Sequence, residues 1–170
     1  MIDIAIKIEY PGSGIDTDRL NRAVEVVLME EGVEAAAIIV AVVDDARIRD
    51  LNRRYLDHDE PTDVLSFDLA DENGRLEGDV VVSAEMAERA ATRLLWPAGD
   101  ELLLYVIHGI LHLVGYDDLD VPSRTDMRRR ERHYLARFGL HPPAIDLAGE
   151  SPDGSQEGNP ELLLSHEFSP

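Results

Sequence analysis

The sequence predicts an α+β fold, an α/β sandwich in which a four-stranded mixed sheet packs against a buried central helix. Two observations support this class. Segments with strand periodicity alternate with helical segments in the first half of the chain, and helical segments follow from residue 84 onward. Between Leu102 and Val114, nine residues are Leu, Ile or Val. They lie all round the helical wheel, which is typical of a helix buried on every side.

The first part of the chain contains two predicted strands with a helix between them. Residues 2–8 alternate apolar and polar side chains, as a half-buried strand does. The helix begins after Asp16 or Thr17, either of which can cap it, and Gly32 stops it. Residues 36–43 are a continuous apolar run, which predicts a central strand covered on both faces.

The middle of the chain contains a short helix followed by a predicted hairpin. The helix is expected over residues 46–55, because two aspartates directly before it can cap its N-terminus. Residues 62–68 alternate as a strand, and residues 78–83 form a further strand. The turn-forming residues 71–74 lie between these two segments, so we expect them to pair as a hairpin.

Three helices are predicted in the second half of the chain. Ser83 caps a helix that runs to about Leu95, and Asp100 caps the central helix. Pro122 lies just inside a last helix, which ends at Gly139. The exposed side of this last helix is expected to be basic and to carry Arg124, Arg128, Arg129, Arg130, Arg132 and Arg137.

Length and composition indicate one folded domain and a tail. The domain is expected over residues 1–140, whereas residues 141–170 contain six acids, no Lys or Arg, and many Pro, Gly and Ser residues. We expect this acidic tail to be disordered. There is no apolar run of membrane-spanning length and no signal-peptide pattern, so we expect a cytoplasmic protein without a membrane partner. A net charge of −19 opposes non-specific binding to nucleic acid.

The central helix carries a candidate metal-binding pattern. His108 and His112 are four residues apart, so their rings project from the same face of the helix. Gly115 stops the helix, and Asp118 follows three residues later. Two imidazoles and one carboxylate with a fourth position open is the arrangement of a catalytic zinc site, and the absence of cysteine excludes thiolate ligands. The spacing alone also allows two hydrogen-bonded core histidines followed by an ordinary helix-end aspartate.

The spacing resembles that of the metzincin proteases, with two differences. Residue 109 is glycine, where those proteases carry the glutamate that acts as general base. Asp118 occupies the position where their third histidine is usual. We therefore expect a site that activates water through a metal, but not a standard peptidase.

Segments along most of the chain carry a closer family resemblance. They are Leu51 to Tyr55, Pro61 to Phe67, Gly78 to Ser83 and His108 to Asp117. In this order and spacing they resemble the YbeY family of bacterial endoribonucleases, which act in ribosomal RNA maturation and ribosome quality control. The resemblance covers about residues 1–140, which would then be a metal-dependent hydrolase domain.

The resemblance implies one divalent metal ion, usually taken as Zn²⁺, held by His108, His112 and Asp118. It also implies cleavage of single-stranded RNA with the two histidines as catalytic residues. Ribosomal RNA, the small ribosomal subunit and ribosome-associated proteins would be the partners.

The family has histidine at the position of Asp118. Aspartate can bind zinc, but its charge would make the metal less electrophilic and could favour another ion. Asp117 and Asp120 are alternative ligands.

A second departure from the family concerns substrate binding. The family usually has an arginine where this chain has Leu56, and a leucine cannot contact a phosphate or stabilise developing negative charge. Arg53, Arg54 or His58 can take over this role, or all three are ordinary surface residues. Ser66 lies in the strand expected to form the cleft wall.

Two hypotheses follow: an endoribonuclease, or a ribosome-maturation factor that binds partners, holds a structural metal and has little nuclease activity.

Overall fold

A mixed four-stranded sheet forms the middle layer of the computed structural model, which describes residues 1–12, 14–69 and 73–143. The strand order is β1-β2-β4-β3, with β1 parallel to β2, β2 parallel to β4 and β3 antiparallel to β4. The bounds are Ile2–Ile8 for β1, Ala36–Val43 for β2, Val64–Asp68 for β3 and Leu76–Ser83 for β4. The mixed sheet and the hairpin of β3 and β4 confirm both sequence predictions.

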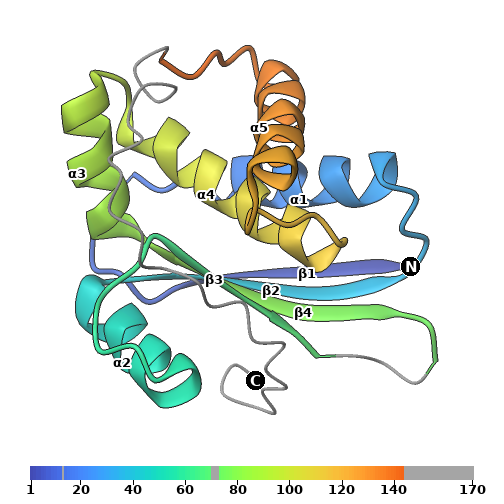
Figure 1. Ribbon diagram of the computed structural model, residues 1–170, viewed down its shortest axis with the longest axis horizontal. Coiled ribbons are helices and arrows are strands. Elements are labelled where there is room, and N and C mark those ends of the chain that lie inside the picture. The colour runs from blue at the N-terminus through green and yellow to red at the C-terminus, as the bar shows by residue number, and fades with distance from the viewer. Residues whose placement is uncertain (13, 70–72, 144–170) are drawn as a thin grey trace.

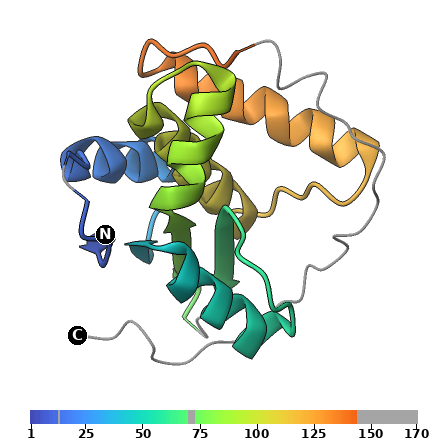
Figure 2. The same cartoon turned by 90° about the vertical axis from the view of Figure 1, so that its left-hand side faces the viewer.

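Helices cover the two faces of this sheet unequally. In the described residues, four helices lie on one face and α2 lies on the other, as Figure 1 shows, and Figure 2 shows the same separation after a turn of 90°. The bounds are Thr17–Glu30 for α1, Asp45–Leu56 for α2, Ala84–Leu94 for α3, Ala98–Leu113 for α4 and Val121–Ala136 for α5. The predicted α+β class is therefore confirmed.

Each face of the sheet has its own hydrophobic core. The larger core lies under α1, α3, α4 and α5 and includes Leu103 and Ile107 of the central helix α4. The smaller core lies under α2 and includes Ile48 and Phe67. Because side chains alternate across a strand, successive residues of the apolar β2 run contribute to opposite cores, which is why both of its faces are apolar.

The capping residues predicted for α1, α2 and α3 are confirmed, and α5 is capped by Asp120, for which the sequence analysis named no cap. Backbone N–H groups of the first turns donate to the side chains of Asp16, Asp44, Ser83 and Asp120. The prediction that Asp100 caps α4 is wrong. The helix begins earlier, with Pro97 at the capping position, and Asp100 lies in its first turn, where it pairs with Arg19 at 2.7 Å. Proline has no side-chain acceptor, so α4 begins without a side-chain cap, and the N–H groups of Asp100 and Glu101 donate to the Pro97 carbonyl at 3.0 Å and 3.2 Å.

Two sequence predictions fall on parts of the chain that the structure does not describe. Residues 144–170 of the predicted acidic tail and residues 71–72 of the predicted turn lie outside the described residues. Among the helices that are described, none alone is long and apolar enough to cross a membrane. Together α3 and α4 have the length and apolar composition of a membrane span, and the pair is bent by 119° at its break.

Candidate metal centre

Glycine at position 109 sets how closely α4 approaches the sheet. A Cβ atom there would lie 2.5 Å from Cγ1 of Val80 and 3.1 Å from both Oγ of Ser66 and Cγ2 of Val64. The Ser66 hydroxyl donates a 3.0 Å hydrogen bond to the Gly109 carbonyl oxygen. The sheet therefore fills the space that a protease glutamate would need, which explains in physical terms why that base is absent.

A glycine turn ends α4 and redirects the chain beneath the histidines. Gly115 has φ +106, its N–H donates to the carbonyl of His112 at 3.0 Å, and the N–H of Tyr116 donates to the carbonyl of Leu111 at 2.9 Å. This pair of bonds is the Schellman motif, and the left-handed φ is one that glycine adopts readily. The Tyr116 hydroxyl accepts from Nε of Arg130 at 2.6 Å, which holds the new direction of the chain.

The next residue orients the third candidate ligand. The Asp117 carboxylate accepts hydrogen bonds from the backbone N–H of Asp118 at 2.6 Å and of Leu119 at 3.0 Å. This local turn uses the Asp117 side chain, and Asp120 is occupied in capping α5. Of the three aspartates that the sequence left open, Asp118 is the one that joins the two histidines.

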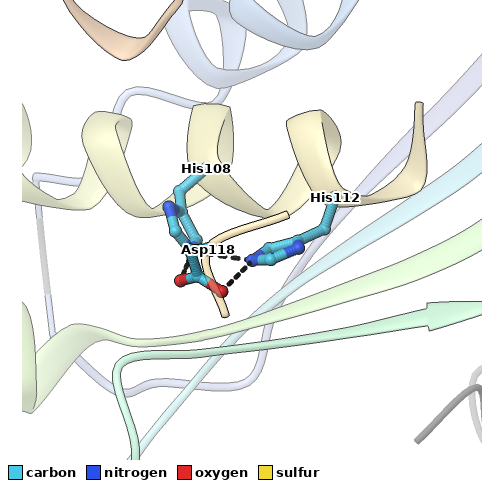
Figure 3. A group of neighbouring side chains, drawn as sticks. All are labelled: His108, His112 and Asp118. Atoms are coloured by element: carbon cyan, nitrogen blue, oxygen red, sulfur yellow. Dashed lines mark hydrogen bonds and ion pairs between the residues drawn. The ribbon is translucent and has the colours of Figure 1, made fainter. Parts of the chain in front are cut away.

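The three side chains converge on one point (Figure 3). Nε2 of His108 lies 3.0 Å from Nε2 of His112, and the Asp118 carboxylate oxygens lie 3.6 Å and 3.7 Å from these two atoms. Two tetrahedral ligand atoms on one zinc ion are roughly 3.3 Å apart when each bond is about 2.05 Å. The 3.6 Å and 3.7 Å distances go to different oxygens of Asp118, and one ligand atom from each residue lies within 4.8 Å of the other two, so the three side chains are close enough to hold a single metal ion.

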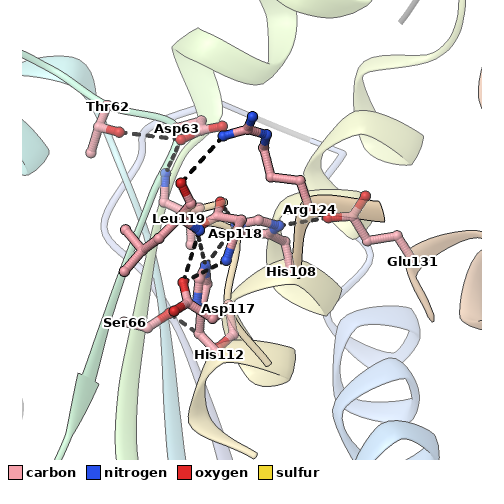
Figure 4. Close-up of polar contacts among 12 residues, drawn as sticks. Thr62, Asp63, Ser66, His108, His112, Asp117, Asp118, Leu119, Arg124 and Glu131 are labelled. Atoms are coloured by element: carbon pink, nitrogen blue, oxygen red, sulfur yellow. Dashed lines mark hydrogen bonds and ion pairs between the residues drawn. The ribbon is translucent and has the colours of Figure 1, made fainter. Parts of the chain in front are cut away.

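Glu131 of α5 fixes the ring of His108 from the other side (Figure 4). Nδ1 of His108 lies 2.6 Å from Oε1 of Glu131, whose side chain is only 15% exposed. A carboxylate that accepts the Nδ1 proton leaves the Nε2 lone pair available, and Nε2 is the atom that faces Asp118. Glu131 was not predicted from the sequence, because it contacts a residue of another helix 23 positions earlier in the chain. No local spacing pattern indicates such a contact.

The electrostatics of the group favour a bound cation. Burial opposes protonation of His108, but the hydrogen bond to Glu131 and the charges of Glu131, Asp63 and Asp118 outweigh it and raise the pKa of the ring. The contact with His112 lowers the pKa of Asp118, so this carboxylate is ionised at neutral pH. The carboxylates of Asp118 and Glu131 thus stabilise a positive charge at this group.

Of the four predicted substrate-binding residues, Ser66 contacts the helix that carries this group. Ser66 lies on β3 beside Gly109, whereas Arg53 and Arg54 lie on α2, which covers the opposite face of the sheet (Figure 1). Both guanidinium groups pair with Asp50, at 2.7 Å and 3.0 Å. Their role in substrate binding stays a prediction.

The loop after α2 holds the fourth predicted substrate-binding residue, and Leu56 is the last residue of α2 itself. His58 lies in this loop, and its backbone N–H donates to the carbonyl of Asn52 at 3.3 Å. The buried Asn52 side chain donates in turn to the carbonyl of Glu60 at 2.9 Å, which ties the loop to α2. Leu56 packs against the smaller core, so its side chain serves packing and offers no charge to a substrate.

Fold and site together define a class: an α+β protein whose buried central helix presents a His-His-Asp group able to hold one metal ion. Comparison with known families agrees with this class. The family model described as Endoribonuclease YbeY matches residues 7–139. The chain therefore belongs to the YbeY family, as its sequence motifs predicted.

Individual relatives show the same likeness. The chain is 41% identical over 132 residues to the Endoribonuclease YbeY of Pelotomaculum thermopropionicum, which covers 73% of this chain and 87% of that relative. It is 39% identical over 125 residues to the one from Rhodopirellula baltica, covering 72% of this chain and 64% of that longer relative. A solution structure of a Thermotoga maritima protein superposes with a TM-score of 0.59 at 28% identity, covering 94% of this chain and 100% of that one.

Proposed function

We propose that this protein is a metal-dependent endoribonuclease that cleaves single-stranded RNA, acting on ribosomal RNA of the small subunit in maturation and ribosome quality control. The observation that carries the proposal is the convergence of His108, His112 and Asp118 within 4.8 Å of one another. Membership of a family whose curated members are named endoribonucleases supports the choice of RNA. We assign the activity to residues 1–140 and expect it in the cytoplasm.

Zinc is the ion that the donor set favours. His108, His112 and Asp118 would hold it, and two imidazoles with one carboxylate leave a fourth position for water or substrate. The chemistry that such an ion supplies when bound is polarisation of a phosphoryl oxygen and acidification of a water molecule. Glu131 orients the His108 ring, and the 40% exposure of the Asp118 side chain leaves the group open to an RNA strand.

A cleavage assay on single-stranded RNA tests this function. We expect wild-type protein to cleave the RNA, chelation to stop cleavage and added Zn²⁺ or another divalent ion to restore it. His112→Ala should lower the rate at least a hundredfold, because it removes one of three protein ligands from the ion. The matched control His141→Ala replaces an exposed histidine outside the group and should cleave at the wild-type rate. Undiminished cleavage by chelated His112→Ala protein would contradict the proposal.

A binding factor for ribosome maturation, with a structural metal and little nuclease activity, is the second candidate. The packing of Leu56 into the smaller core favours it, because that position offers no cation to a substrate. The two functions differ in the behaviour of folded His112→Ala protein. A binding factor would still associate with the ribosome fraction and support maturation, whereas a nuclease would associate without supporting it.

A further inference from the structure

The arginines of α5, together with Arg137 directly after it, divide into two sets by their partners. Arg129 pairs with Asp126 at 3.2 Å, Arg130 with Glu31 at 3.6 Å, and Arg137 with Glu30. No carboxylate of the described residues lies within ion-pair distance of the other set, Arg124, Arg128 and Arg132. Arg124 donates instead to the backbone carbonyl of Leu119 at 3.4 Å. We refer to Arg124, Arg128 and Arg132 as the α5 stripe.

These three positions form one row on the helix. They are four residues apart, so their side chains lie on one face at intervals of about 6 Å along the axis. The prediction from the sequence places all six arginines on one exposed, basic side of the last helix. Arg130 departs from this expectation, because its Nε points back to the Tyr116 hydroxyl at 2.6 Å.

The α5 stripe begins beside the candidate metal centre. Its first member, Arg124, contacts the residue that follows Asp118, and Figure 4 shows its side chain among the polar residues of the site. Its other members border a groove of about 60 Å³ between α4 and α5, which is also lined by Leu104 and by Glu131, the partner of His108. The row therefore leads away from the metal group along one wall of a groove.

The charge of the whole chain makes this row unusual. Aspartate and glutamate number 35 against 16 lysines and arginines, so the overall field repels RNA. Many arginines elsewhere are neutralised by a neighbour, as in the pairs Arg49–Asp59 and Arg75–Asp3. Arg124, Arg128 and Arg132 are half-exposed or exposed and make no ion pair with a described carboxylate, although the charge of Arg124 helps to lower the pKa of Asp120. They therefore present a row of positive charge that begins beside the group that would cut RNA.

We propose that Arg124, Arg128 and Arg132 bind the phosphate backbone of the single-stranded RNA that leads to the metal centre. Guanidinium groups suit this task, because their planar donors match phosphate oxygens. This inference rests on the proposed function and assigns its substrate-binding cations to α5, whereas the cations on α2, Arg53 and Arg54, already pair with Asp50.

Salt-dependent RNA binding tests the α5 stripe without relying on cleavage. The triple variant R124Q/R128Q/R132Q is compared with R49Q/R89Q/R129Q, which removes the same charge from exposed arginines that are paired with carboxylates. The probe is a fluorescein-labelled 16-nucleotide single-stranded RNA in chelator, and a gel confirms that it stays intact. The slope of log affinity against log salt changes by about 0.7 for each lost phosphate contact.

We expect the stripe variant to lose about two units of this slope and to bind at least tenfold more weakly at about 0.1 M salt. The control should stay within about twofold of wild type, and R124K/R128K/R132K should recover most of the slope, because counterion release follows charge. Should the triple variant fail to fold by circular dichroism, R132Q alone, at an exposed position, should lose about 0.7 units.

The outcomes separate this inference from the proposed function. Wild-type protein that cleaves RNA while the stripe variant binds with unchanged affinity and slope would overturn the inference and leave the function standing. An equal loss in the control would also overturn it, because net charge alone would then explain the binding. Wild-type protein that neither binds nor cleaves RNA would overturn both.

Discussion

At the scale of single residues, the metal group depends on side chains that do not belong to it. Asp117 uses its carboxylate to orient the backbone of Asp118, and Glu131 uses its carboxylate to hold the Nδ1 proton of His108. Such partners fix the ring and the lone pair that a metal ion needs. Substituting Asp117 or Glu131 therefore tests the metal site as directly as substituting a ligand does.

Glu131→Gln should weaken metal binding by about 10- to 100-fold while leaving the fold intact. The amide can still accept or donate one hydrogen bond, but it carries no charge to favour the Nδ1 tautomer of His108. Competition with a chromogenic chelator gives the affinity, and ring ¹⁵N shifts give the tautomer. Asp126→Asn, an exposed acid on the same helix, is the control and should change neither. Wild-type affinity and an unchanged tautomer in Glu131→Gln would contradict this role.

Asp79 makes the stability of the protein depend on pH. Burial raises the pKa of this carboxyl from 3.8 to about 6, and the charge of Lys7 offsets only part of the effect. The folded protein therefore holds the proton more tightly than the unfolded chain. This contribution to stability is complete below the unfolded pKa of 3.8 and is lost as the pH rises through about 6.

Asp79→Asn should accordingly stabilise the protein at pH 7.5 by about 1–3 kcal/mol, because a shift of one pKa unit is worth about 1.4 kcal/mol. The gain should shrink to near zero at about pH 4, where the wild-type carboxyl is protonated in the folded protein. Urea unfolding at both pH values measures it. Glu77→Gln removes the same charge two residues earlier in β4 from a half-exposed position and serves as the control. A stability difference that did not vary with pH would count against the account.

At the scale of elements, the approach of α4 to the sheet positions both histidines. Gly109→Ala should destabilise the protein by about 1–3 kcal/mol, because the new methyl group would meet the rigid Val80 side chain at 2.5 Å. Thermal unfolding measures the cost.

Gly99→Ala is a matched control for Gly109→Ala in the same helix. A Cβ atom at Gly99 has only a guanidinium nitrogen of Arg19 nearby, at 3.9 Å, and an alanine there should be neutral or stabilising by up to about 1 kcal/mol. Equal effects of the two substitutions would show that lost glycine flexibility, and not contact with the sheet, explains them.

Local sequence signals predicted most of the elements. The apolar run of β2 and the caps at Asp44 and Ser83 are features of a few adjacent residues, so they can be recognised without the fold. The prediction for Asp100 was wrong because an acid before an apolar segment is typical of a helix cap. The structure instead pairs Asp100 with Arg19 of another helix, which local sequence does not indicate. The ligands were predictable from spacing, but Glu131 was not, because its contact exists only once α5 packs on α4.

At the scale of the whole molecule, partly buried polar contacts tie α5 to the rest of the fold. Glu31, just after α1, accepts from the Tyr134 hydroxyl of α5 at 2.6 Å and from the Tyr116 hydroxyl at 3.2 Å. One carboxylate thus joins α1, the turn before Asp118 and the helix that carries both Glu131 and the α5 stripe. The metal centre and the proposed RNA contact are therefore positioned by the same network.

The central claim is that His108, His112 and Asp118 hold one metal ion, and metal content tests it most directly. Elemental mass spectrometry is applied to purified wild-type protein, to Asp118→Ala and to the control Asp126→Ala, which removes an exposed acid outside the group. The account predicts about one equivalent of zinc or a similar divalent ion in wild type and control, and its loss from folded Asp118→Ala protein. Equal metal in all three proteins, or none in wild type after reconstitution, would contradict the site.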